Sequence, residues 1–294
     1  MKKALITLVI LFTTTISTGY AVLTYLNNRD VSRPDQARIQ ASFDAAIGWL
    51  DAHQGDIIEQ NNPVLWWMIQ RSAALTGNPS LQSAFSRYQQ KHLESARTLW
   101  LPLFFPGRWV PFRNEDIAHL NDYQKLFVYA ISCDPDLGEQ AAITAQLDPD
   151  LCDKQPLRPA CATHQLMAFR FMQQNSCGDN HATQAAVTEL QNRILRQLTW
   201  DPRVVDVYLQ RVLMLTESGA VTRIKAVWLQ QVLDAQLSDG GWGNLDPYLP
   251  LPSDNYLGFG PRGFAIAEPS SDFHATAQGI FIMSLLLNAE AGHP

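Results

Sequence analysis

Acidic residues and histidines at the start of apolar stretches are the residues of this chain best placed to do chemistry. Residues 271–279 put Asp272 and His274 directly before a strongly apolar run, and Asp239 lies in the glycine-rich turn that precedes it. A carboxylate beside an imidazole can move protons, so we take Asp272, His274 and Asp239 as candidate catalytic residues. The structural alternative is that Asp272 caps a helix and His274 lies against the wall beside it.

Other helix starts carry aromatic and polar residues that could form a binding surface. Aromatic rings together with carboxylates are found where proteins process glycans, although an aspartate at a helix start more often acts as a cap. The paired tryptophans could equally belong to the core. The candidate ligand-binding residues are Trp66, Trp67, Trp109, Asp122, Tyr123, His164, Tyr208 and Trp242.

The four cysteines are expected to form two disulfides. A zinc site would have to use Cys161 with His164 and Cys177 with His181, spacings that match no common zinc motif. We therefore predict no metal and no cofactor. The remaining cysteines are Cys133 and Cys152.

Helix geometry predicts which cysteines pair. Cys161 and Cys177 flank one predicted helix, which places them roughly 24 Å apart, too far for a disulfide. Cys133 and Cys177 end two successive helices at the same end of the fold, and Cys152 lies with Cys161 at the opposite end. The predicted bridges are Cys133–Cys177 and Cys152–Cys161.

Apolar and amphipathic helices are predicted to alternate along the chain. Five apolar helices start near Asn62, Asn121, Ala162, Val205 and Ser271. Amphipathic stretches lie before, between and after the first four, at 37–54, 81–96, 137–147, 183–198 and 221–236. No stretch alternates Val, Ile and Thr with period two, so we expect no sheet. The apolar helices would form an inner ring whose N-terminal ends meet at one mouth.

Gln236 and Trp242 carry a resemblance to a known superfamily. The segment 232–243 ends a helix in Gln236 and turns through Gly240-Gly241 into Trp242, and the helix at Asp272 and His274 follows. This resembles the Gln-Trp repeat of the α/α-toroid proteins, namely terpene and squalene cyclases and protein prenyltransferase β subunits. The resemblance implies an all-α, incomplete toroid of about five helical hairpins, with Gln236 and Trp242 tying hairpins together. The prenyltransferase zinc ligands and the Asp-rich cyclase motif are both missing here.

The N-terminal residues are predicted to form a membrane-spanning segment. Lys2 and Lys3 precede an apolar run from Ala4 to about Leu26, which is long enough to span a bilayer. We predict an uncleaved anchor at residues 1–28, with a cleaved signal peptide as the alternative. The expected location is the inner membrane, single-pass, with the globular domain (29–294) in the periplasm.

Charge and composition limit the classes of partner that the protein can bind. The net charge is −6 and no basic cluster occurs, which argues against nucleic acid. We predict a protein that binds a small-molecule, lipid-linked, glycan or protein ligand at the mouth. The alternative is an enzyme that uses Asp272, His274 and neighbouring carboxylates on a prenyl, lipid-linked or glycan substrate.

Overall fold

A ring of five helices forms the centre of the molecule in the computed structural model, which describes residues 2–94, 98–108, 111, 113–155 and 157–290. The helix α15 packs against α4 and α13, and α11 packs against α8 and α13. The short helix α6 (Leu101–Phe104) contacts both α4 and α8 and completes the ring. The five helices are α4 (Pro63–Thr76), α8 (Asp122–Ser132), α11 (Cys161–Asn175), α13 (Asp206–Glu217) and α15 (Phe273–Glu290).

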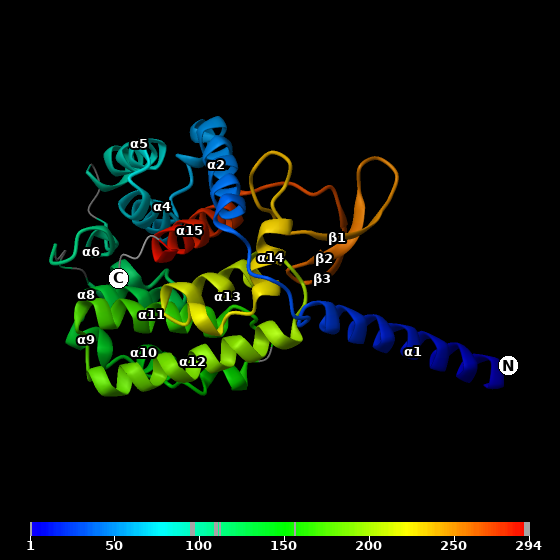
Figure 1. The fold of residues 1–294 in the computed structure, drawn as a ribbon. Helices are drawn as coiled ribbons and strands as arrows, with labels where there is room; N and C mark the ends of the chain where they lie inside the picture. The colour runs from blue at the N-terminus through cyan, green and yellow to red at the C-terminus, as the bar shows by residue number, and fades with distance from the viewer. Residues whose placement is uncertain (1, 95–97, 109–110, 112, 156, 291–294) are drawn as a thin grey trace.

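A second set of helices covers the outside of the ring. The helix α2 packs on α15, α5 on α4, α10 on α8, α12 on α11 and α13, and α14 on α13 (Figure 1). The five inner helices and the outer helices thus occur in the stretches that the sequence predicts. The outer helices are α2 (Gln36–Ala52), α5 (Pro79–Tyr88), α10 (Ala141–Gln146), α12 (Asn180–Trp200) and α14 (Ala226–Asp234).

Shorter helical segments connect these helices. A five-residue π-helical turn (Gln89–Leu93) extends α5, and 3₁₀ turns lie at Leu151–Lys154 and Val221–Arg223. The remaining short helices are α3 (Gln54–Ile57), α7 (Asn114–Ile117) and α9 (Pro135–Gly138).

Aromatic side chains fill the middle of the ring. The ring of Trp67 on α4 lies edge-on to Phe171 of α11 and Phe281 of α15, with centroids 5.0 and 5.4 Å away. Phe127 of α8 meets Phe171 in the same way, at 5.8 Å. Edge-to-face packing of this kind adds to the stabilisation from apolar burial. The ring is therefore plugged, and open space near its axis lies toward one end.

The glycine-rich turn after α14 joins the last hairpin to the first. The amide nitrogen of Gln236 donates to the carbonyls of Ser42 in α2 and Gly240 in the turn, at 2.8 and 2.7 Å. Trp242 is fully buried, and its indole N–H donates to the carbonyl of Val232 at 2.7 Å. Gln236 therefore connects α2 with the turn that follows α14.

A three-stranded antiparallel sheet follows this turn and lies beside α14 (Figure 1). Its strands are β1 (Asp246–Pro250), β2 (Tyr256–Gly260) and β3 (Gly263–Ala267), in that order. A register shift occurs in β1 between Pro247 and Leu249. The prediction of an all-α fold is therefore wrong. Strand β1 contains two prolines, and β3 alternates Phe264 and Ile266 with Gly and Ala, so a search for alternating Val, Ile and Thr does not detect the sheet.

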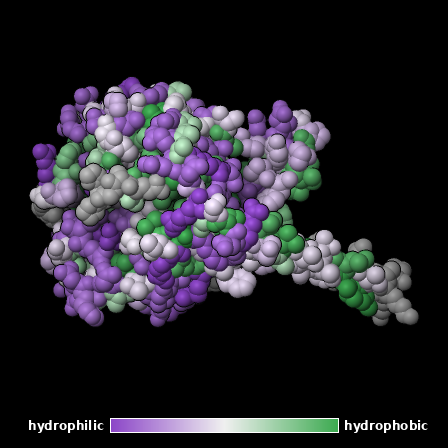
Figure 2. Space-filling model, in the orientation of Figure 1, coloured by the Kyte–Doolittle hydropathy of each residue, from purple (hydrophilic) through white to green (hydrophobic). Residues whose placement is uncertain are grey.

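The N-terminal helix α1 (Lys2–Leu26) projects away from the body (Figure 1). Apolar side chains such as Ile10, Leu11 and Ile16 are exposed along it, and green surface marks the helix in Figure 2. Within the described part of the chain, however, no helix combines the length and the apolar character needed to cross a membrane. Hydroxyl residues between Thr13 and Thr18 dilute the apolar run. The predicted anchor, and with it the predicted single-pass inner-membrane location, is wrong.

Two disulfides join the same cysteines that the helix order predicts. Cys133 is bonded to Cys177, with Cα atoms 5.2 Å apart, and Cys152 to Cys161, with Cα atoms 5.6 Å apart. The first links the C-terminal ends of α8 and α11. The second closes a short loop before α11.

Candidate functional site

The first turns of the five inner helices surround a cavity of about 150 Å³, here called the mouth cavity. Each inner helix contributes at least one side chain, so their N-terminal ends do meet at one end of the ring. The lining residues are Asn62, Pro63, Val64, Leu65, Met68, Trp100, Tyr123, Gln124, Phe127, His164, Met167, Gln210 and His274.

Local capping fixes where three of these helices begin. The Asn62 side chain accepts from the backbone N–H of Val64, and Pro63 occupies the first turn of α4. Asn121 and Gln124 form a reciprocal capping box at α8. Asp272 accepts from the backbone N–H of Ala275 and caps α15. These short-range bonds place side chains of the following turn at the cavity.

His164 of α11 lines the mouth cavity. Its imidazole stacks on Tyr123, with centroids 4.2 Å apart and planes 6° apart. No hydrogen-bond partner is found for either ring nitrogen among the described residues. Burial, with a smaller contribution from the charge of His274, lowers the pKa of His164 to about 4. The imidazole is therefore neutral near pH 7, with one nitrogen able to donate and the other to accept.

His274 enters the cavity from α15 beside a carboxylate. Its Nδ1 lies 3.7 Å from Oδ2 of Asp206 in the first turn of α13, and its side chain is 45% exposed. At that distance the pair is a loose ion pair when the imidazole is protonated. His274 can therefore meet a ligand from solvent with the carboxylate of Asp206 close by.

A second cavity of about 500 Å³, the outer cavity, adjoins the first, since Tyr123 and His164 line both. Asp122 lies on its wall, and so do Arg158, Gln155 and Cys161 from the loop before α11. The stacked pair of Tyr123 and His164 thus forms the partition between the two spaces.

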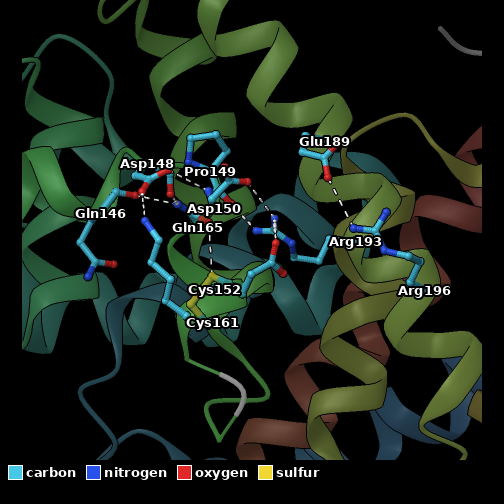
Figure 3. A network of polar contacts seen from close by, with 12 residues as sticks. Gln146, Asp148, Pro149, Asp150, Cys152, Cys161, Gln165, Glu189, Arg193 and Arg196 are labelled. Atoms are coloured by element: carbon cyan, nitrogen blue, oxygen red, sulfur yellow. Dashed lines mark hydrogen bonds and ion pairs between the residues drawn. A yellow bond between two sulfur atoms is a disulfide. The ribbon is translucent and has the colours of Figure 1, made fainter.

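Two devices hold the loop that walls the outer cavity. The Cys152–Cys161 disulfide closes it, and the buried guanidinium of Arg193 on α12 bonds to the carbonyl of Pro149 and to the carboxylates of Asp150 and Asp153 (Figure 3). A buried arginine needs such partners to offset its desolvation. Neither Arg193 nor any of its three partners lines either cavity, so we assign the network a structural role.

Two of the three candidate catalytic residues lie outside both cavities. Asp272 accepts from Asn244 at 2.7 Å in addition to its capping bond. Asp239 accepts from the backbone N–H of Gly241 at 3.0 Å and from the hydroxyl of Ser271 at 2.5 Å. Both carboxylates hold the turn that leads into α15, and only His274 of the three lines the mouth cavity.

The candidate binding residues divide in the same way. Asp122, Tyr123 and His164 line the cavities. Trp66, Trp67, Tyr208 and Trp242 are buried in the core and line neither. Tyr208, for example, bonds through its hydroxyl to Asn27 and Gln231. Trp109 lies outside the described residues.

Several lining residues have no sequence signal of their own. Gln210, Met68 and Met167 sit one turn inside their helices, where a glutamine or methionine is ordinary. A helical projection from each predicted first turn could have found them, since residues i and i+4 share a face. Only the order of the helices around the ring decides which face is the inner one.

No group of three metal-binding side chains occurs in the part of the chain that the structure describes. No protein-family model, curated protein or solved structure matches the chain. The arrangement at the mouth therefore has to be interpreted from its own chemistry. It offers a small, partly apolar cavity with two imidazoles and several amides.

Proposed function

We propose that the protein binds a small ligand in the mouth cavity. The observation that carries this proposal is the convergence of five helix starts on one cavity, beneath which the ring is plugged by Trp67, Phe171 and Phe281. A ligand is thus held at the mouth and does not pass through the ring. Small-molecule sites are usually concave and mostly apolar, with a few polar groups that fix orientation.

Methionine methyl groups give a direct test. Met68 and Met167 line the cavity, whereas Met172, Met214 and Met283 are buried elsewhere in the core and serve as controls. In protein labelled with ¹³C at the methionine methyls, we expect benzyl alcohol, a small uncharged probe, to shift only the first two signals, saturably and with a millimolar Kd. Unchanged Met68 and Met167 signals up to the solubility limit of the probe would exclude the proposal.

The pair of His274 and Asp206 supports a second candidate, general acid–base catalysis. The carboxylate would hold the imidazole in one orientation while its free nitrogen exchanges a proton with a bound substrate. In an assay with p-nitrophenyl acetate and p-nitrophenyl glycosides, turnover that His274→Ala abolishes without changing the Tm supports this candidate. Equal turnover in the wild type and His274→Ala counts against it.

A further inference from the structure

Two amide side chains at the mouth cavity have their oxygens already engaged. Oδ1 of Asn62 accepts from the backbone N–H of Val64 at 3.2 Å, and Oε1 of Gln124 accepts from the backbone N–H of Asn121 at 3.1 Å. A backbone N–H can only donate, so these two bonds fix which end of each amide is the oxygen. The NH₂ groups of Asn62 and Gln124 have no partner among the described residues.

Gln210 lies deeper, with a side chain that is 6% exposed, and its amide contacts the hydroxyl of Thr163 at 2.6 Å. That hydroxyl carries one hydrogen and also bonds to the carbonyl of Ala160 at 2.9 Å, so it accepts from the Gln210 NH₂ when the Ala160 bond is made. The contact with Thr163 therefore does not fix which end of the Gln210 amide faces the cavity, and the donors of fixed orientation are those of Asn62 and Gln124.

The rest of the lining adds donors but no dedicated side-chain acceptor. The indole N–H of Trp100 can only donate and has no protein partner in the described chain, while His164, His274 and Tyr123 can donate or accept. No Asp, Glu, Lys or Arg lines the mouth cavity. The N-terminal ends of the five helices also favour negative charge there.

The deeper wall is apolar, formed by Leu65, Met68, Phe127 and Met167. The volume of about 150 Å³ is that of a cavity known to hold one benzene ring. A ligand group that fits has an apolar body of about six heavy atoms. Its polar end would lie among the amides of the first turns.

We propose that the mouth cavity takes a small aromatic or branched apolar group that carries acceptor oxygens, as in a carboxylate or a carboxamide. This inference rests on the proposed function and specifies its ligand class. An ammonium group, which only donates, would meet the NH₂ groups of Asn62 and Gln124 and offer neither of them an acceptor.

The test compares four probes of one shape by the methionine methyl signals: benzoate, benzamide, benzyl alcohol and benzylamine. We expect benzoate and benzamide to shift Met68 and Met167 with a Kd at least fivefold below that of benzylamine. Benzoate binding more tightly than benzamide identifies an anionic ligand, and the reverse order a neutral carbonyl. If benzylamine binds as tightly as benzoate and benzamide, the proposed ligand class is wrong, but the cavity is still a binding site. No shift with any probe, benzyl alcohol included, overturns the site as well.

A variant removes one donor whose orientation is fixed. Gln124→Glu keeps an oxygen that accepts from the backbone N–H of Asn121 and replaces the NH₂ group by a second acceptor oxygen. We expect the Kd for benzoate, which can only accept, to rise at least tenfold, while that for benzyl alcohol, whose hydroxyl can donate to the new oxygen, changes less than twofold. Equal weakening of both probes would assign Gln124 a packing role and contradict the donor argument.

Discussion

His164 shows how a single side chain can be both stable in its place and available for contact. Tyr123 covers one face of the imidazole ring, and neither ring nitrogen has a protein partner among the described residues. Proteins pair most buried polar atoms, so an unpaired imidazole at a cavity marks a place where water or a ligand completes the bonding. Burial at this position also makes protonation of the His164 imidazole unfavourable.

The unfavourable protonation of His164 in the folded chain predicts that the free energy of unfolding depends on pH. The pKa of His164 is about 4 in the folded chain and 6.5 in the unfolded chain, so between these values the unfolded state binds more protons. The contribution of His164 to the free energy of unfolding is fully present above pH 6.5. Roughly 3 kcal/mol of it is lost as the pH falls toward 4. Urea unfolding of the wild type and His164→Gln from pH 7 to pH 4 should show the smaller loss in the variant. Parallel curves would contradict a buried neutral imidazole.

At the scale of elements, close approach between α15 and the glycine-rich turn decides which residues are permitted. A Cβ on Gly279 would lie 2.4 Å from the indole of Trp242, far inside contact distance. Gly48 on α2 has nothing within 4 Å of the same position. The two glycines are thus alike in sequence context, both within helices, and opposite in surroundings.

Alanine substitution should therefore act in opposite directions at these two glycines. Gly279→Ala overpacks the junction and should destabilise the fold by about 1–3 kcal/mol. Gly48→Ala should stabilise it by about 0.5–1 kcal/mol, because alanine loses less backbone entropy in a helix. Thermal unfolding of both variants provides the measurement. A stable Gly279→Ala protein would mean that Trp242 can move away from α15.

The disulfides also act between elements, and their loop lengths rank them. Cys133 and Cys177 are 44 residues apart, and Cys152 and Cys161 are 9 apart. In the chain-entropy description the longer loop contributes about 4 kcal/mol and the shorter about 3 kcal/mol. Urea unfolding of the double variants Cys133→Ala/Cys177→Ala and Cys152→Ala/Cys161→Ala should show that order. Only Cys152→Ala/Cys161→Ala should also disturb the outer cavity. A larger loss of unfolding free energy in that variant than in Cys133→Ala/Cys177→Ala would contradict the ranking.

The whole molecule depends on contacts that close the ring between the two ends of the chain. Gln236, after the last outer helix, bonds to the carbonyl of Ser42 in the first one, and Arg38 of α2 pairs with Asp234 of α14. The Arg38 pair is exposed and contributes little, so Gln236 carries more of the junction. Loss of this junction would loosen α2 and α15 together and with them one wall of the mouth.

Gln236→Ala should cost about 1–3 kcal/mol, because the carbonyls of Ser42 and Gly240 lose a shared donor in a half-buried place. Gln40→Ala, on the exposed face of α2, is the matched control and should stay within about 0.5 kcal/mol of the wild type. Denaturant midpoints measure both. A neutral Gln236→Ala would show that helix packing alone closes the ring.

The sequence by itself determined the positions of the helices and the pairing of the cysteines. Caps such as Asn62 and Asn121 act within one turn, so they can be recognised without knowledge of the fold. Helix length, another local quantity, excluded a Cys161–Cys177 bridge, and the expected order of the helices then gave the two pairs. The sheet was missed and the N-terminal helix was wrongly predicted to span a membrane, since short strands rich in Gly, Ala or Pro and a diluted apolar run depart from the averages on which such predictions rest.

Only the tertiary structure decided which side chains reach the mouth. Trp66 and Trp67 look like binding residues in sequence and are core, whereas Gln210 looks ordinary and lines the cavity. Periodicity shows that a helix has an apolar face but does not show whether that face meets packed neighbours or open space. That distinction depends on how five helices, distant in sequence, are arranged around one axis.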